Sequence, residues 1–535
     1  MARYLRIVVA LGALASMAGG GAVPAAHVAV ESPIHTARII APHPGDFPGP
    51  QPFGTIGATK AGPTNKNVRV NNAAREGQLA GCNVQSETSL ASYQDTVLVG
   101  FNDAQQCKDT FVSSGDPITW TGLSVSTDGG KSFKDVGPVV PNGDIVNLWG
   151  DPALAVDTTG KDAGTFYLAS LADRSSGSST VSTIGVGVSH DSGKTFKWYD
   201  AAPTSLAADF QDKEWITVDN SGGPTDGYVY LTWTDFGGTT DLHFARSTDG
   251  GRTWSKPVVL SKAGGTASRP VVGPDGELYV VWEEGAFDAP LNSPASLRDG
   301  RIVMARSTNA GESFSTPAPV AKVTVPGRSS ACPTPRDVLN GDMRTWSDPS
   351  IAVDTFGSSN PRAADYNPYR GTVYVTFETH GSGADMADVF LTTLPGGRGK
   401  WTKPQNLSRD GTTTDQFLAE VAATGPGRFA ATWTDRRGDA VANRLMAQWA
   451  TTGSKGGAVL DKPVQLSDVD FPPPLTNPNS DVAVATCYAG DYNGLFAAPG
   501  QPAVASWGDD RDSIVVQGYQ GAAIPDPNVY FSRIP

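Results

Sequence analysis

Short runs of alternating apolar and polar residues dominate the chain, and turns rich in glycine and proline separate them. A typical unit reads Leu242-His-Phe244-Ala-Arg246, then a tight turn, then a Pro-Val segment beginning at Lys256. Alternation with a period of two predicts strands that bury one face, and the residues between them predict hairpins. The pattern therefore predicts an all-β protein built from antiparallel hairpins.

One turn recurs four times between such strands. The copies share the pattern Ser-x-Asp/Asn-x-Gly-x-Ser/Thr-aromatic, and its central position holds Asp128, Asp191, Asp249 and Asn309. An Asp or Asn side chain there accepts hydrogen bonds from downstream amides, and the glycine accepts a positive φ. We therefore predict that these four residues have a structural role, and that the closing aromatic ring is buried beneath the turn.

A second repeat precedes the turns. It is a β-rich run that ends in an aromatic residue and then an acid, with the weakest copy at Asp173 and the others ending at Asp103, Asp235, Glu284, Glu378, Asp435 and Asp509. The turn positions 128, 191, 249 and 309 are 63, 58 and 60 residues apart. Residues 83–535 give about 65 residues for each of seven units or about 75 for each of six. Two insertions, around residues 323–344 and 453–479, account for the longer mean and favour seven.

The four turns resemble the Asp box, the bacterial neuraminidase repeat found in sialidase-like β-propellers. The resemblance covers the chain from about Cys82 to its last residue. It implies a propeller of four-stranded antiparallel blades, for which we prefer seven blades and keep six as the alternative. The last blade lacks an outer strand, and residues 67–71 are expected to supply it, which would leave no open edge in the ring.

The chain divides into three predicted parts. Residues 1–26 read as a secretory signal peptide, because Arg3 and Arg6 precede an apolar run that is too short to span a membrane. Residues 27–65 form a lead-in rich in Pro, Gly and Ala, and residues 66–535 form a single propeller. We therefore expect a secreted, extracellular protein that is a monomer without a membrane span.

The cysteines and the net charge add two expectations. The four cysteines suit two disulfides, with free thiols as the alternative, and we predict the pairs Cys82 with Cys107 and Cys332 with Cys487. The net charge of −13 and the pI of about 4.9 argue against a nucleic-acid partner.

Candidate chemistry lies where the propeller topology brings charged loops together. If the repeated turn joins the third and fourth strands of a blade, the loops at the opposite face surround an axial mouth, where binding residues are expected. The sialidase resemblance implies three arginines for a sugar carboxylate, a tyrosine nucleophile with a glutamate base, and an aspartic acid. The nominated arginines are Arg269, Arg344, and Arg436 or Arg511. The nominated nucleophile is Tyr488 or Tyr492, its base Glu214 or Glu420, and the acid Asp151 or Asp235. Trp346 is the candidate for stacking on a sugar ring.

Two functions remain open. One is a secreted glycoside hydrolase of the sialidase-like type that acts on terminal, sialic-acid-type sugars of exogenous glycans, and it predicts three converging arginines. The other is a non-catalytic extracellular propeller that binds a glycan or a protein, and it predicts a mouth whose arginines are paired with carboxylates. The family's Arg-Ile-Pro motif occurs here only at residues 533–535. No cofactor is expected and no metal site is nominated, since the six histidines lack ligand spacing, while oxygen-rich loops leave calcium open.

Overall fold

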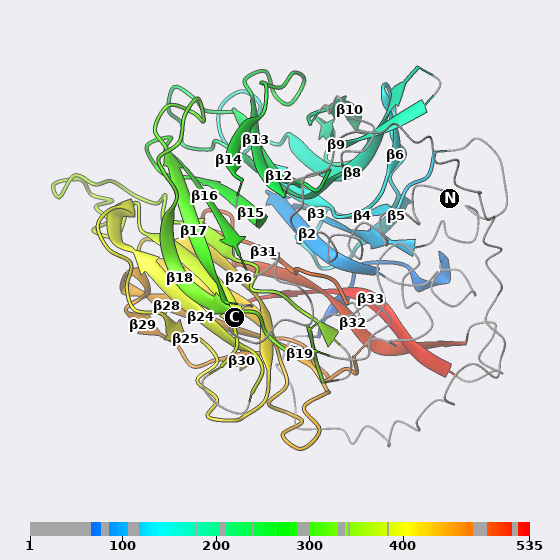
Figure 1. Cartoon of the computed structure of the whole chain (residues 1–535), viewed down its shortest axis with the longest axis vertical. Coiled ribbons are helices and arrows are strands. Elements are labelled where there is room, and N and C mark those ends of the chain that lie inside the picture. Colours follow the sequence, from blue (N-terminus) through cyan, green and yellow to red (C-terminus); the bar gives the residue numbers. More distant parts are fainter. Residues whose placement is uncertain are drawn as a thin grey trace, which may run out of the picture.

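Seven antiparallel sheets, each four strands deep, follow one another around a ring in chain order (Figure 1). The computed structural model describes residues 66–75, 85–104, 117–177, 179–202, 210–237, 240–262, 264–285, 299–329, 337–340, 343–381, 385–473, 489–515 and 523–535. The predicted β-propeller is confirmed, and the count is seven blades rather than six. The predicted signal peptide, the lead-in, Tyr488 and the four cysteines lie outside the described residues.

Blades 1 to 3 each run from an inner strand at the axis to an outer strand. Their strands are β2 (Gln85–Tyr93), β3 (Thr96–Asp103), β4 (Thr121–Ser126) and β5 (Lys134–Pro138) in blade 1; β6 (Ile145–Leu148), β7 (Ala153–Val156), β8 (Phe166–Ser176), β9 (Ser179–Ser189) and β10 (Lys197–Asp200) in blade 2; and β11 (Gln211–Val218), β12 (Val229–Asp235), β13 (Asp241–Ser247) and β14 (Val258–Ser261) in blade 3. In blade 2, β6 and β7 both pair with β8 and share the inner position.

Blades 4 to 6 repeat this order. Their strands are β15 (Gly265–Val272), β16 (Leu278–Glu284), β17 (Asp299–Ser307) and β18 (Ala318–Thr324) in blade 4; β22 (Ser350–Val353), β23 (Val373–Thr379), β24 (Asp388–Leu394) and β25 (Gln405–Asn406) in blade 5; and β26 (Gln416–Gly425), β27 (Arg428–Asp435), β28 (Ala447–Ser454), β29 (Val459–Leu460) and β30 (Val464–Gln465) in blade 6. Between blades 4 and 5 in the chain, where an insertion was predicted, the structure has a small sheet of β19 (Arg328–Ser329), β20 (Asp337–Leu339) and β21 (Met343–Arg344).

Blade 7 joins the two ends of the ring. It consists of β31 (Gly494–Phe496), β32 (Val504–Val515) and β33 (Ala523–Arg533), and its fourth strand is β1 (Val68–Arg69), which pairs with β33. The predicted closure is therefore confirmed. Figure 1 shows the red strands of blade 7 beside the blue first blade.

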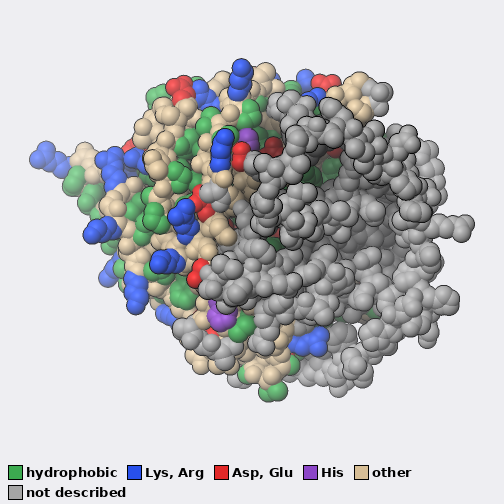
Figure 2. Space-filling model, viewed as in Figure 1, with side chains coloured by type: hydrophobic (Ala, Val, Ile, Leu, Met, Phe, Trp, Pro, Cys, Tyr) green, Lys and Arg blue, Asp and Glu red, His purple; other side chains and the backbone are tan. Residues whose placement is uncertain are grey.

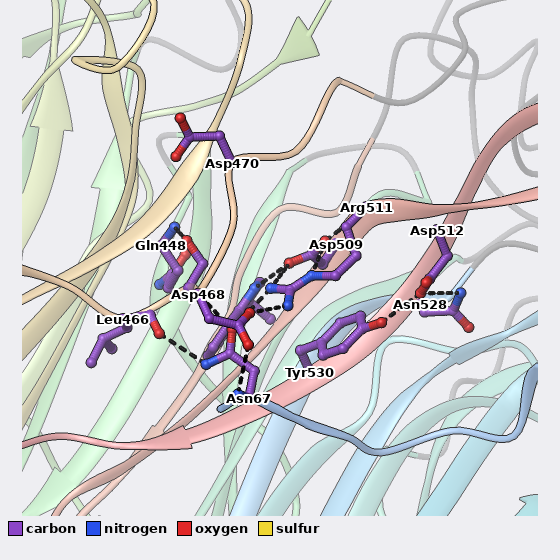
Figure 3. A network of polar contacts seen from close by, with 12 residues as sticks. Asn67, Gln448, Leu466, Asp468, Asp470, Asp509, Arg511, Asp512, Asn528 and Tyr530 are labelled. Carbon is purple, nitrogen blue, oxygen red and sulfur yellow. Dashed lines mark hydrogen bonds and ion pairs between the residues drawn. The ribbon is translucent and has the colours of Figure 1, made fainter. Parts of the chain in front are cut away.

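A polar network fixes this closing strand (Figure 3). The Asn67 side chain donates to the Leu466 carbonyl at 2.9 Å and accepts from Arg511 Nη2 at 2.9 Å. Arg511 forms ion pairs with Asp509 and Asp468, and its guanidinium carbon lies 3.9 Å from the centre of the Tyr530 ring. Arg511 therefore links the closing segment to both blade 6 and blade 7.

The core lies between blades rather than within them. Seven clusters of buried apolar residues are found among the described residues, and each lies at one of the seven contacts between neighbouring blades. The largest buried rings come from second strands, as Trp233, Trp282, Trp433 and Trp507. Each of the last three donates its indole N–H to the acid two residues later, which explains the aromatic-x-acid repeat.

Each repeated turn joins the third and fourth strands of blades 1 to 4. Asp128 Oδ1 accepts the amides of Lys131 and Ser132 at 3.0 Å each, and Oδ2 accepts the Ser132 hydroxyl at 2.6 Å. At Asn309, the amide nitrogen donates to Ser313 Oγ at 2.9 Å instead. Hydrogen bonds within the turn thus occupy this side chain, as predicted, and in blade 1 they lower the pKa of Asp128.

The glycine two residues after the Asp or Asn of each turn faces the preceding blade. A Cβ added at Gly311 would lie 2.3 Å from the Phe244 ring, and one at Gly130 would lie 2.4 Å from the Phe531 ring. The position before it also has a positive φ, yet it holds Ala310 in blade 4 and Ser192 in blade 2. Close packing between blades, rather than φ alone, therefore requires the glycine.

Blades 5 and 6 contain two further turns of this kind that lack the carboxylate. Gly397 and Gly457 have φ values of 66° and 92°, and an added Cβ would lie 2.2 Å from Tyr279 Oη and 2.7 Å from Thr393 Cγ2 of the preceding blades. They fall in the short 3-10 turns η5 (Pro395–Gly397) and η6 (Lys455–Gly457). Another 3-10 turn, η2 (Ala73–Arg75), follows β1. No helix in the described part of the chain is long and apolar enough to cross a membrane.

Candidate active site at the axial mouth

The mouth lies where inner strands begin and second strands end. The register places Gln85 beside Asp103, Gln211 beside Asp235 and Gln416 beside Asp435, so both sets of termini share one face of the ring. The repeated turns lie at the other end of the strands. The loops that precede inner strands and follow second strands therefore lie on this face, opposite the repeated turns.

Four inner strands carry a bulge close to their first residue. In each bulge one residue that is not glycine has a positive φ: Glu87 at 50°, Lys213 at 56°, Ala267 at 53° and Leu418 at 55°. Such a conformation costs about 1–3 kcal/mol, and a bulge changes the direction of its side chain. Asp151, at φ 53°, takes the same conformation just before β7.

Glu87, Asp151 and Asp212 form a carboxyl cluster beside the axis. The Asn102 side chain joins two of them, because its Nδ2 donates to Glu87 Oε2 at 2.9 Å and its Oδ1 accepts the Asp151 amide at 2.6 Å. Burial, the Glu87 charge and a hydrogen bond with Glu87 raise the pKa of Asp151 well above its ordinary value. Asp151 remains partly exposed. These effects favour the protonated form of Asp151, at a residue that solvent reaches.

A second group of charges surrounds Asp491, whose side chain is fully buried. Arg344 binds it through two hydrogen bonds of 2.7 and 3.2 Å, and Lys213 forms an ion pair with the same carboxylate. Burial alone would raise the pKa of Asp491, but the two cations hold it below its ordinary value. Burial would likewise lower the pKa of Lys213, and the carboxylates of Asp491 and Glu87 raise it instead. Both shifts favour the charged forms of Asp491 and Lys213.

Asp348 lies near the charges of Asp491 and Lys213 and is partly exposed. Burial raises its pKa to about 7, with Asp491 acting in the same direction and Lys213 against it. Behind it, Glu283 is fully buried, and burial together with the Asp348 charge raises the pKa of Glu283 to about 8. The half-buried Trp346 ring has its centre 5.8 Å from the Arg344 guanidinium carbon. Asp348 can thus gain or lose a proton near neutral pH.

We call the charged residues described so far the charged layer: Glu87, Asp151, Asp212, Lys213, Arg344, Asp348 and Asp491. Side chains from four blades meet next to this layer. The Arg269 guanidinium stacks on Trp215, with 3.2 Å from its central carbon to the ring centre, and pairs with Glu420 at 3.1 Å. The Tyr492 ring meets Trp215 edge-on at 5.3 Å, and its hydroxyl donates to the Pro152 carbonyl at 3.1 Å. We call these four side chains the axial plug: Trp215, Arg269, Glu420 and Tyr492.

The structure gathers some of the nominated residues around the axis and separates others. Asp151, Arg344 and Trp346 lie at the charged layer. Glu214 is buried near Asp212 and Glu87, and burial raises the pKa of Glu214. Arg269, Glu420 and Tyr492 belong to the axial plug. Arg436 is fully buried against Asp415 at 3.4 Å, Arg511 belongs to the closure network, and Asp235 accepts the Gly237 amide at 2.8 Å. The roles assigned to them from sequence remain predictions.

Four central residues were assigned no catalytic or binding role from the sequence, although the last three were expected in the mouth loops: Glu87, Lys213, Asp348 and Asp491. A shared sequence pattern could have singled out Asp348. Asp151 and Asp348 each lie two residues before the first residue of an inner strand, and a proline follows each of them. Within the described residues, no group of three or more His, Cys, Asp or Glu side chains is arranged to hold a metal ion. Lys213 and Arg344 instead supply the positive charge among these carboxylates.

Several solved structures are similar to this chain at low sequence identity, each with a TM-score below 0.5. An α-L-arabinofuranosidase of Fusarium graminearum, solved with arabinobiose, is 16% identical, covers 88% of this chain and 98% of its own, and has a TM-score of 0.41. The intramolecular trans-sialidase of Ruminococcus gnavus is 12% identical over 68% of this chain and 93% of its own, with a TM-score of 0.41. An ulvan lyase is 12% identical over 88% and 94%, with a TM-score of 0.48. No protein-family profile and no curated protein matches the chain.

Proposed function

We propose that this protein is a secreted glycan-active enzyme, a glycoside hydrolase that cleaves at the axial mouth. The observation that carries the proposal is the partly exposed Asp151, because burial and, after it, the charge of Glu87 raise its pKa well above the ordinary value. Glycoside hydrolysis needs an acid that protonates the leaving oxygen and a second carboxylate that acts at the sugar carbon. Two carboxyl groups whose environments separate their pKa values meet this need.

In this proposal Asp151 is the general acid and Asp348 is the second carboxylate. The raised pKa of Asp151 favours its protonated form, and Asp348, whose pKa is raised to about 7, can release its proton near neutral pH. Asp491 keeps Lys213 and Arg344 in place and stays charged. Trp346, half-buried beside Arg344, offers a ring on which a sugar can stack.

A neutral sugar fits this mouth better than a sialic-acid-type sugar. Among the described residues of the charged layer there are five carboxyl groups, and the cations beside them, Lys213 and Arg344, both pair with Asp491. A sugar carboxylate would have to displace Asp491 from Lys213 and Arg344. The axial plug also pairs Arg269 with Glu420. These internal pairs equally favour the second candidate, a non-catalytic propeller that binds a glycan.

Hydrolysis of a panel of aryl glycosides, the sialoside included, and of polysaccharides by the purified protein tests the proposal. We expect Asp151→Asn to lower kcat/KM on glycans with poor leaving groups by about 10²–10⁴-fold, the range for a positioned acid. The variant should retain activity on dinitrophenyl glycosides, which leave without a proton.

Asp275→Asn is the matched control, because Asp275 is exposed, lies at a hairpin turn away from the mouth and pairs with Arg370 at 2.8 Å. Equal activity of Asp151→Asn and this control would refute the role of Asp151. Binding of a glycan without turnover by the folded protein would instead establish the non-catalytic candidate.

A further inference from the structure

A group of exposed cations lies at the end of blades 5 and 6 opposite the axial mouth. We call it the basic patch: Arg398, Lys400 and Lys403 of the turn between β24 and β25, Arg428 at the turn between β26 and β27, Lys455 of η6, and Lys462 after β29. All six side chains are exposed. Figure 2 shows Lys and Arg side chains gathered over this side of the ring, to the left of the view.

Hydrogen bonds hold the turns of the patch together. The Gly456 amide donates to the Gly427 carbonyl at 2.9 Å, which places the Lys455 turn beside the turn that carries Arg428. Gln405 Nε2 donates to the Gly457 carbonyl at 3.1 Å, and Arg409 donates to the Leu460 carbonyl at 3.3 Å. These bonds join blade 5 to blade 6, so the six cations lie on a rigid surface.

One cation of the patch, Lys455, stands where the repeated turn has its carboxylate, and the equivalent turn of blade 5 has no carboxylate. Blades 1 to 3 place Asp128, Asp191 and Asp249 two residues before the packed glycine, whereas blades 5 and 6 place Pro395 and Lys455 there. No described carboxylate forms an ion pair with any of the six cations. The exposed acid beside them, Asp461, accepts the Thr452 hydroxyl at 2.6 Å.

Unpaired like charges repel one another, so such a cluster opposes folding unless it binds an anion. The cluster is also unusual in a protein with a net charge of −13. Trp401 stands between Lys400 and Lys403 and is only half-buried, which offers a sugar ring an apolar face beside cations. A long duplex would lie near the protein's own negative charges, which argues against nucleic acid.

From these observations we propose that the basic patch binds an anionic polysaccharide, one that carries carboxylate or sulfate groups. Its cations bind the acidic groups of the polymer, and Trp401 contacts a ring between them. The mouth and the patch lie at opposite ends of the strands, so a polymer on the patch leaves the mouth free. This binding requires no catalysis, so the test of the basic patch is independent of the test of hydrolase activity.

The test is binding of the purified protein to immobilised dextran sulfate, polygalacturonate and neutral dextran, measured by biolayer interferometry at low and high salt. We expect binding to the two anionic polymers that weakens as salt rises, and no binding to dextran. The variant Lys400→Glu/Lys403→Glu/Lys455→Glu should bind at least about tenfold more weakly.

The matched control is Lys131→Glu/Lys194→Glu/Lys256→Glu, which makes the same change in charge at exposed positions of the turns in blades 1 to 3. It should change affinity by no more than about twofold, because charges beyond about 10 Å are screened. An equal loss in both variants, equal binding to neutral dextran, or competition by duplex DNA at the same charge concentration would each overturn the proposal. Melting temperatures of both variants verify folding.

Discussion

Substitution of Gly311 by alanine tests why the repeated turn needs a glycine two residues after its Asp or Asn. The cause is either packing between blades or backbone strain. An added Cβ would lie 2.3 Å from two carbon atoms of the Phe244 ring, which is fully buried in the cluster between blades 3 and 4. The ring has no free space to move into, and overpacking of this kind costs about 1–3 kcal/mol. The positive φ of 78° adds about 1 kcal/mol. We therefore expect a loss of about 2–4 kcal/mol.

The matched control is Gly250→Ala. Gly250 has a φ of 73°, and the nearest atom to its added Cβ would be Tyr167 Oη at 3.7 Å. The equivalent residue of blade 4 is already Ala310. This variant keeps the backbone strain without the clash, and alanine also reduces the entropy of the unfolded chain, so the cost should be at most about 1 kcal/mol.

Differential scanning calorimetry measures the contrast. Residues 66–535 number 470, and an unfolding entropy of about 2.1 cal/mol/K per residue gives about 1 kcal/mol/K, so each kcal/mol lowers Tm by about 1 °C. Gly311→Ala should lower Tm by about 2–4 °C and Gly250→Ala by about 1 °C or less. Equal shifts in the two variants would refute the packing argument and leave backbone strain as the cause.

Three further outcomes are expected. Burial raises the pKa of Glu283 to about 8, so the folded state holds a proton that the unfolded state releases near pH 4.5, and stability falls as pH rises between these values. The Tm of Glu283→Gln should therefore fall less than that of the wild type across this pH range. Parallel Tm curves for the two proteins would contradict the raised pKa. Arg511→Met removes two ion pairs and the bond to Asn67, and should cost about 3 kcal/mol, with faster amide exchange in residues 66–71 by mass spectrometry; unchanged exchange there would show that β1 is held without Arg511. Arg269→Met leaves Glu420 buried and unpaired, and should destabilise the protein by about 3 kcal/mol in urea unfolding, whereas Arg269→Met/Glu420→Gln should recover most of it; equal loss in both variants would show that the pair is not coupled.

The sequence predicted the architecture because its signals are local and repeated. The spacing of Asp128, Asp191 and Asp249 gave the length of a blade, and strand alternation gave the hairpins. The closure by residues 67–71 followed from one missing outer strand. The turns of blades 5 and 6 were missed because the predicted pattern includes an Asp or Asn, where these turns have Pro395 and Lys455. The feature that they share with the other turns is the packed glycine, Gly397 and Gly457.

The centre of the candidate site could not be predicted in the same way. Asp491 meets Lys213 and Arg344 only because segments of blades 7 and 3 and the small inserted sheet converge at the axis. The bulges that direct Glu87 and Lys213 depend on positive φ values that neither residue type favours. Charge composition placed the residues at the mouth, but register and bulge geometry decided their partners.

The pairing of β1 with β33 also sets the order in which the molecule can fold. Val68 pairs with Phe531, 463 positions later in the chain, so this contact closes a far longer loop than any hairpin within a blade. Loop closure of that length carries a large entropy cost, which falls only after the intervening blades have brought the two strands together. The seam between blade 7 and blade 1 should therefore form last during folding, and it is the natural point at which the ring begins to open.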